Sequence, residues 1–296
     1  MRAACLAIVV VLVALFLASI RRYYHPDSGF TALIGLPEGN GDYEAPALRG
    51  VPHYVHPPAV SYDGQFYAQR ALDPLLRDPL TDRAMDLAPL RARRILFSWT
   101  AYVAGFGRPA WILEAYALQN VVAWLLLAVL LARWLPVRTP RGLAAWTACL
   151  FSHGLLWSVR FSLLDGPSLL LTALAVKLAE DGRPLASAAL AGVNGLGRET
   201  NVIGALAQPI PRSGRDWARL AIAALLVVVP LLVWEDYLRS IYRSTMFAGA
   251  GLPLTQSAAA FWHTVVRVSE RIQSNGLWSP AGLGACILLS VLAQAA

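Results

Sequence analysis

One acidic side chain, Asp63, stands among aromatic residues in a polar stretch of the chain. The stretch reads Ser-Tyr-Asp-Gly-Gln-Phe-Tyr over residues 61–67, and the pattern predicts a short amphipathic helix from Gln65 to about Arg77. Asp63 then lies at or just before the N-terminus of this helix, where free N–H groups and the helix dipole stabilise a carboxylate. The aromatic neighbours can stack on sugar faces, and the carboxylate can accept a proton from an attacking hydroxyl. The alternative is that Asp63 is only a helix N-cap.

A second acidic residue and a basic cluster extend this chemistry. Asp165 opens a later apolar segment as Leu-Asp-Gly-Pro, either as an N-cap followed by a turn or as a second catalytic carboxylate. The polar stretch carries arginines at positions 91, 93 and 94, of which Arg91 and Arg94 share one helix face. Guanidinium groups pair bidentately with phosphate oxygens, so these two are candidate phosphate ligands, with an interfacial anchor as the alternative.

A charge pair, Arg198-Glu199, interrupts the apolar segment from about 185 to 210. Ionisable residues inside apolar segments are costly, so they predict a functional site. Neighbours in sequence do not face each other on a helix, so we expect different partners for the two. Arg198 is expected to meet a lipid phosphate, and Glu199 to be a structural acceptor.

Other chemistries have little support in the sequence. His53 and His56 lie three residues apart in a proline-rich loop, which is weak evidence for a metal, so no firm cofactor is expected and a divalent cation stays open. The cysteines, at positions 5, 149 and 286, lie in apolar segments without paired spacing, which argues against disulfide and zinc frameworks. Nucleotide hydrolysis and thiol chemistry lack their sequence motifs.

The composition indicates a membrane protein. Hydrophobic residues make up 57% and charged residues 15% of the chain, with a mean hydropathy of +0.51, whereas a soluble domain is nearer half apolar and a quarter charged. The formal net charge of +7 is carried almost wholly by arginine. These arginines are spread over short connections between apolar segments, where they report orientation and lipid contact. We therefore expect membrane lipids, and no nucleic acid, as partners.

The apolar segments predict several membrane helices. The first, residues 3–20, has about the length needed to cross a bilayer; a cleaved signal peptide is the alternative, and a retained helix is preferred because further spans follow. A polar insertion, residues 21–110, comes next, with a helix from about Leu90 to Ala104 expected to lie in the membrane interface. The later segments lie at about 111–132, 142–159, 163–179, 185–210, 217–238 and 280–296.

Arginines between these segments predict the topology. Arg133, Arg138 and Arg141 follow the second segment and place that connection in the cytoplasm. The N-terminus is then cytoplasmic, and both the 21–110 loop and Asp165 are outside. A single span at 185–210 would put the next arginines outside, whereas a re-entrant hairpin broken at 194–199 puts them inside and is preferred.

The sequence thus predicts an all-α polytopic membrane protein with a single membrane domain over residues 1–296. Its outer loop spans 21–110 and its helical bundle spans 111–296. The last segment, 280–296, is short for a span. Either the chain is a fragment or its last helix is marginal.

This arrangement resembles the GT-C glycosyltransferases. The likeness is to bacterial members with a Tyr-Asp-Gly-Gln-Phe-Tyr signature, an Asp-to-Arg-Arg stretch and an Arg-Glu-Thr tripeptide, which here are residues 62–67, 86–94 and 198–200. The resemblance implies a GT-C-like helical bundle and an inverting enzyme. Such an enzyme moves a sugar from a polyprenyl-phosphate donor to a cell-envelope glycan, lipid or protein acceptor, on the outer face of a bacterial inner membrane.

The resemblance also implies roles for residues. Asp63 matches the acidic residue that acts as base, and Asp165 matches a second, assisting acid. The lipid phosphate would be held by Arg91, Arg94 and Arg198. Tyr62, Gln65, Tyr67 and Glu199 complete the predicted substrate-binding set. The alternative function is a transporter or flippase of a lipid-linked glycan, with Arg198 and Glu199 as substrate groups at the membrane midplane.

Overall fold

The computed structural model describes residues 2–39, 43–207, 213–242 and 254–276. Regular structure over these ranges is helical, apart from isolated β-bridges at His25–Gly29 and Pro37–His56, so the all-α prediction is confirmed there. The chain divides into two units, residues 1–242 and 243–296. The second contributes helix α12, Leu254–Asn275, and segment 280–296 lies outside the described residues. The following paragraphs concern the first unit.

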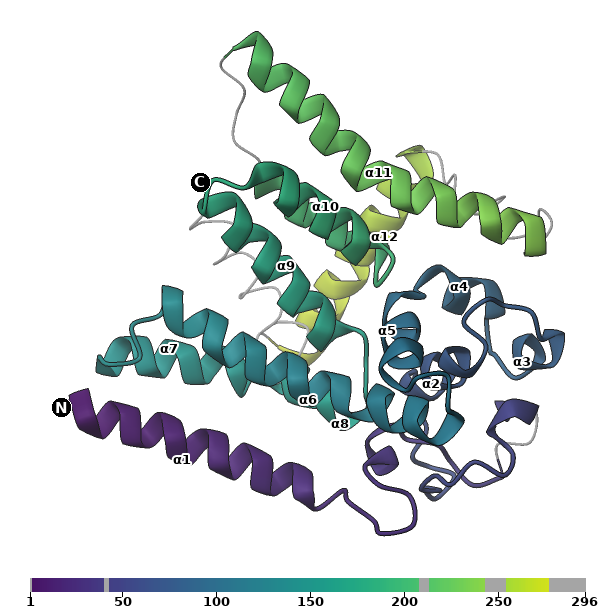
Figure 1. Cartoon of the computed structure of the whole chain (residues 1–296). Helices are drawn as coiled ribbons and strands as arrows, with labels where there is room; N and C mark the ends of the chain where they lie inside the picture. Colours follow the sequence, from purple (N-terminus) through teal and green to yellow (C-terminus); the bar gives the residue numbers. More distant parts are fainter. Residues whose placement is uncertain (1, 40–42, 208–212, 243–253, 277–296) are drawn as a thin grey trace. The chain divides into compact units, whose positions relative to one another are not determined.

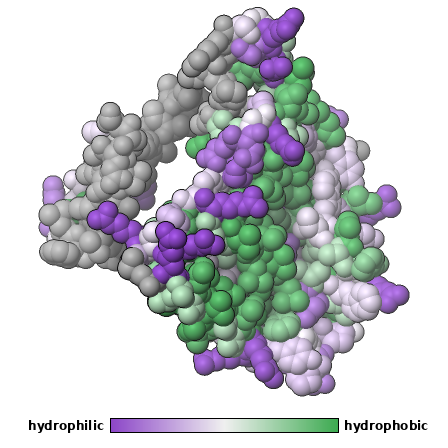
Figure 2. Space-filling model, turned by 60° about the vertical axis from the view of Figure 1, so that its left-hand side comes forward, coloured by the Kyte–Doolittle hydropathy of each residue, from purple (hydrophilic) through white to green (hydrophobic). Residues whose placement is uncertain are grey.

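Three helices among the described residues are long and apolar enough to cross a membrane: α1 (Arg2–Arg21), α6 (Pro109–Trp134) and α11 (Gly214–Tyr242). Helices α7 (Pro140–Leu150) and α8 (His153–Arg160) are bent by 43° and would make a fourth span if they cross together. Figure 2 shows a broad area of apolar side chains on the face in view. These observations support the prediction of a membrane protein.

The segment from 185 to 210 is not one continuous helix. Helix α10 (Pro184–Gly195) ends at the predicted break, and a 3₁₀ helix, η4 (Glu199–Ala207), follows it. Asn201 Nδ2 donates to the Asn194 carbonyl at 3.2 Å, while Ala205 packs against a buried cluster made of Ala188, Ala191, Ala223 and Val227. The chain therefore reverses between α10 and η4, as in the predicted hairpin; residues 208–210 are outside the described ranges.

The polar insertion folds into short helices that gather at one end of the long helices (Figure 1). We refer to this end as the loop end. The preceding 21–63 region carries the 3₁₀ helices η1 (Thr31–Leu33) and η3 (Pro46–Leu48). The short α-helices are α2 (Gly64–Leu72), α3 (Pro79–Arg83), α4 (Ala88–Arg93) and α5 (Leu96–Ala104).

The boundaries of these short helices correct two predictions. The helix expected over 65–77 ends at Leu72, because the Asp73 carboxylate accepts from the backbone N–H groups of Arg77 and Asp78 in a turn. The single helix expected over 90–104 is broken between α4 and α5. At this break, Leu96 N donates across the structure to the Leu196 carbonyl at 3.1 Å.

Both helices are also more buried than the sequence predicts. Gln69 and Arg70 of α2 are fully buried. Gln69 Oε1 accepts from Ala45 N, and Arg70 Nη2 binds Asp82 Oδ1 at 2.7 Å. Phe97 of α5 is buried within the protein, and the Trp99 ring meets Trp234 edge-on at 4.9 Å. Part of the apolar side of 90–104 therefore packs within the protein, whereas Tyr102 and Val103 of the same helix stay exposed.

Helix α9 (Asp165–Glu180) begins at the loop end and is 16 residues long. Its N-terminus docks on α6, where Asn120 Nδ2 donates to the Leu163 carbonyl at 2.8 Å. At its other end, Trp134 Nε1 of α6 donates to Glu180 Oε2. Asp165 therefore lies at the same end of the unit as the short helices that follow Asp63.

Candidate functional site

A small cavity at the loop end brings most of the predicted site residues together. Its volume is about 220 Å³, and we call it the polar cavity. Carboxylates and guanidinium groups from four separate parts of the chain meet there. Its lining is Tyr62, Asp63, Tyr67, Arg94, Leu163, Leu164, Asp165 and Arg198.

Asp63 stands at the N-cap position of α2, but its side chain makes no capping hydrogen bond there. Its Oδ1 instead accepts from Arg91 Nη2 at 2.9 Å, and the side chain is 54% exposed. The next residue has to be small, because a Cβ on Gly64 would overlap the Phe161 carbonyl oxygen. The carboxylate thus has a charged partner and remains accessible, as a base requires.

Arg91 holds Asp63 from inside the protein. It is 5% exposed, and its Nε and Nη2 donate to Asp86 Oδ1 and Oδ2 at 2.9 and 2.7 Å. Its guanidinium also lies over the rings of Phe66 and Tyr67. Burial acts to lower the pKa of Arg91, but the hydrogen bonds to Asp86 and Asp63 outweigh burial and raise it. Arg91 does not line the polar cavity, which differs from the environment expected of a phosphate ligand.

Arg94 does line the polar cavity. Its Nε donates to Glu199 Oε2 at 3.3 Å, and its Nη1 donates to the Tyr67 hydroxyl oxygen at 3.4 Å. Burial acts to lower the pKa of Arg94, and the neighbouring Tyr67 and Glu199 oxygens outweigh it and raise the pKa. Glu199 also lies 3.7 Å from Arg93, which binds Glu235 of α11. Arg94 therefore stays charged, and its partners Tyr67 and Glu199 come from distant segments of the chain.

Asp165 and Arg198 form an ion pair between the start of α9 and the turn before η4. Their side chains are 51% and 40% exposed. Arg198 and Glu199 thus bind different partners, as predicted for adjacent residues. Asp165 is the first residue of α9, and Leu164 occupies the N-cap position.

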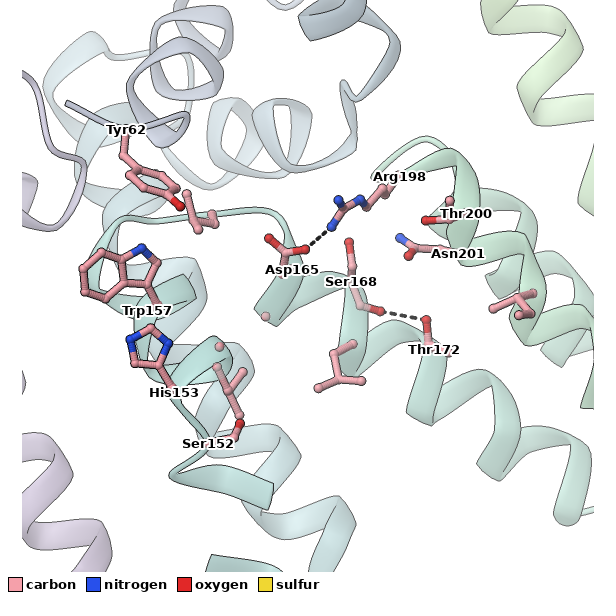
Figure 3. Close-up of a pocket in the computed structure, with 16 residues that line it drawn as sticks. Tyr62, Ser152, His153, Trp157, Asp165, Ser168, Thr172, Arg198, Thr200 and Asn201 are labelled. Atoms are coloured by element: carbon pink, nitrogen blue, oxygen red, sulfur yellow. Dashed lines mark hydrogen bonds and ion pairs between the residues drawn. The ribbon is translucent and has the colours of Figure 1, made fainter. Parts of the chain in front are cut away.

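A second cavity, of about 960 Å³, adjoins the polar cavity, since Tyr62, Leu163, Asp165 and Arg198 line both. We call it the large cavity. It lies between α8, α9 and η4 (Figure 3). On one side, His153 stacks on Trp157 at 5.2 Å, and Trp157 meets the Tyr62 ring edge-on at 6.1 Å.

Several lining residues of the large cavity were missed in the sequence. Ser168 and Thr172 of α9 and Asn201 of η4 line it. Asp165, Ser168 and Thr172 follow one another at i, i+3 and i+7, which puts them on one helix face. This polar pattern in an otherwise apolar segment was the available signal. Trp157 carried no comparable signal.

Other candidate residues lie outside both cavities. Gln65 is buried, and its Nε2 donates to Ser61 Oγ at 2.6 Å. His53 Nδ1 and His56 Nε2 lie 2.7 and 2.8 Å from the carbonyls of Val51 and Ala32. Within the described ranges, no group of three or more His, Cys, Asp or Glu residues is arranged to hold a metal ion.

No protein-family model matches the chain, and no curated protein or solved structure matches it at a significant level. The functional argument therefore depends on the residues of the two cavities.

Proposed function

We propose that this chain is a membrane glycosyltransferase of the GT-C type, which uses a polyprenyl-phosphate-linked sugar and inverts the anomeric carbon. The observation that carries the proposal is the polar cavity, in which Asp63, Asp165, Arg94 and Arg198 meet at one end of long apolar helices. An acid–base group and cations for a phosphate are the chemistry that such a transfer needs. The acceptor is a cell-envelope glycan, lipid or protein at the outer face of a bacterial inner membrane.

Asp63 acts as the general base in this proposal. A hydroxyl is a poor nucleophile near neutral pH, so a positioned carboxylate must take its proton during attack. The acceptor oxygen forms a bond to the anomeric carbon while the bond from that carbon to the phosphate oxygen breaks. The acceptor proton passes to Asp63, and the electron pair leaves with the polyprenyl phosphate.

Arg94 and Arg198 bind the donor phosphate and stabilise it as it leaves. A guanidinium fork matches phosphate oxygens, and its charge is worth more in a protein cavity than in water. Arg198 would exchange its contact with Asp165 for the phosphate, which would free Asp165 to bind the sugar or the acceptor. Arg91 acts as the residue that positions Asp63.

The partners of the charge pair favour a transferase over a transporter. Arg198 binds the first residue of α9, and Glu199 binds Arg94, which directly follows α4. Arg94, Asp165 and Arg198 line the same polar cavity as Asp63, so these charges lie next to the proposed base.

The test is transfer activity of the purified chain in nanodiscs, with polyprenyl phosphates that carry different radiolabelled hexoses or pentoses and membranes as acceptor. Asp63→Asn keeps the shape and can still accept from Arg91, but cannot take up the proton. We expect a loss of about 10²- to 10⁴-fold in turnover with donor binding retained.

Asp27→Asn is the matched control, because Asp27 is an exposed carboxylate of the same insertion that lines neither cavity. Equal activity of wild type and Asp63→Asn would contradict the assignment of the base. Flipping of a lipid-linked glycan that is insensitive to Asp63→Asn and abolished by Arg198→Gln would establish the transporter instead.

A further inference from the structure

We propose that the large cavity is a saccharide-binding site, in which Ser168 recognises a sugar hydroxyl and the rings of Trp157 and Tyr62 cover the apolar face of the sugar. The inference rests on the proposed function and deepens it, because it identifies the large cavity as the site that holds the carbohydrate part of a substrate. Its support comes from the two opposite sides of the cavity.

One side carries the polar stripe, which we define as Asp165, Ser168 and Thr172 of α9. Ser168 is 3% exposed, yet its hydroxyl has no hydrogen-bond partner among the described residues. Thr172 Oγ1, in contrast, donates to the Ser168 carbonyl and accepts from Asn194 Nδ2, both at 2.9 Å. A buried hydroxyl without a partner is costly and uncommon in native proteins. Ser168 therefore has an unused hydrogen-bonding capacity in the lining of the cavity.

The other side is aromatic. Figure 3 shows Tyr62, Trp157 and His153 along one side of the cavity, with Asp165, Ser168 and Thr172 across from them. Tyr62 and Trp157 are both partly exposed rings. A pyranose presents C–H groups on its faces and hydroxyls around its edge. An aromatic wall opposite a hydroxyl stripe is complementary to that distribution.

The same observations disfavour a purely hydrocarbon ligand. An isoprenoid chain fits apolar lining residues such as Leu169 and Ile203, but it would leave the Ser168 hydroxyl unsatisfied. A sugar satisfies it and reaches Asp165 and Arg198, which line both cavities. A ligand in this position has its sugar next to the groups proposed for catalysis.

The sugar could belong to the donor or to the acceptor, since both are saccharides, and the experiment separates them. Dissociation constants are measured by thermophoresis for wild type, Ser168→Ala, Trp157→Leu and the control Ser187→Ala. Ser187 is a fully buried serine of α10 that does not line the cavity. The probes are polyprenyl phosphate, polyprenyl phosphate carrying glucose, mannose or arabinose, and soluble oligosaccharides of the same sugars.

We expect Ser168→Ala to weaken binding of a sugar-bearing probe by roughly 2- to 12-fold, the value of one hydrogen bond, and Trp157→Leu to weaken it further. Binding of bare polyprenyl phosphate and the Ser187→Ala control should stay within about twofold of wild type. Loss confined to lipid-linked sugars identifies the donor sugar, and loss confined to soluble oligosaccharides identifies the acceptor.

The inference is overturned if wild type prefers no sugar-bearing probe, or if Ser168→Ala and Trp157→Leu leave that preference unchanged. If the protein binds polyprenyl phosphate but neither substitution affects sugar binding, the proposed donor class stands and the large cavity is not the sugar site. Ser168-dependent binding of oligosaccharides without any binding of polyprenyl lipids would support the site while contradicting the proposed donor.

Discussion

Two aspartate–glycine pairs, Asp63-Gly64 and Asp165-Gly166, stand at helix starts of the loop end and hold their carboxylates differently. Asp63 binds an arginine that is 5% exposed and is itself held by Asp86. Asp165 binds Arg198; the Asp165 side chain is 51% exposed and the Arg198 side chain is 40% exposed. A base has to keep its place through turnover, whereas a phosphate-binding arginine has to exchange partners. The difference in burial fits the roles proposed above for Asp63 and Arg198.

The largest expected effect on stability is that of Arg91→Ala. It leaves Asp86 without its bidentate partner and opens a void beside Phe66 and Tyr67. We expect the free energy of unfolding to fall by about 3 kcal/mol, at the low end for a broken buried pair because Asp63 and Asp86 can still be solvated. Arg198→Ala, the matched change at the exposed pair, should cost less than about 1 kcal/mol. Chemical unfolding in detergent measures both, and equal losses would remove the distinction.

A smaller loss in the free energy of unfolding is expected from Gly64→Ala. This change tests the packing that holds Asp63 in position. The added Cβ would meet the backbone carbonyl oxygen of Phe161, which cannot move aside as a flexible side chain can. We expect a loss of about 2 kcal/mol from overpacking, together with reduced transfer activity. Gly154→Ala is the control for stability, since nothing lies within 4 Å of the Cβ position there. A Gly64→Ala protein as stable as Gly154→Ala would show that the contact between α2 and Phe161 is not tight.

Local pattern was sufficient for the long helices and for the break before η4. The apolar segments 3–20, 111–132 and 217–238 correspond to α1, α6 and α11. Their length and uniform hydrophobicity leave few alternatives to a helix. The glycines and charges at 194–199 interrupt such a segment in a visible way. The spread of arginines predicted that Asp63 and Asp165 lie on the same side of the membrane, and in the structure both residues line the polar cavity.

The partners of the arginines could not be predicted in this way. Arg94 binds Glu199, which is 105 positions away in sequence, and a periodicity argument contains no information on such pairs. Arg91 and Arg94 were expected to act together because they share a helix face. That expectation neglected Asp86, whose carboxylate folds back on Arg91 from a turn just ahead of α4. Ser168 was overlooked because a serine in an apolar helix can bond to its own backbone, so a single serine there does not indicate a ligand.

An intermediate effect that depends on pH is expected from Asp86→Asn. The hydrogen bond from Arg91 holds the pKa of Asp86 below its usual value, so the folded state favours the ionised form. This contribution to stability is fully present above the unfolded-state pKa of about 3.9 and is lost as the pH falls through the lower folded-state pKa. Removing the charge should cost about 1.5 kcal/mol at pH 7.

The measurement is thermal unfolding of wild type and Asp86→Asn from pH 7 to pH 3. The difference in Tm should stay constant down to about pH 4 and shrink below it. Asp78→Asn is the control, since Asp78 caps α3 through the Leu80 N–H and lies outside the Arg91 group. A difference that shrinks between pH 6 and pH 7 would point to a histidine rather than to Asp86.

The smallest expected effect is the coupling between Asp165 and Arg198. A double-mutant cycle with Asp165→Asn and Arg198→Gln should give a coupling of about 0.2 to 1 kcal/mol in the free energy of unfolding, because both side chains are exposed. At 1 M salt the Debye length falls to about 3 Å, so this coupling should nearly vanish. The equivalent cycle with Asp86→Asn and Arg91→Gln should keep most of its coupling. If the Asp165–Arg198 coupling survives high salt, the pair is as fixed as the buried one. A weak pair is what the proposed exchange requires, because a phosphate can take Arg198 from Asp165 only if that contact contributes little to holding the fold together.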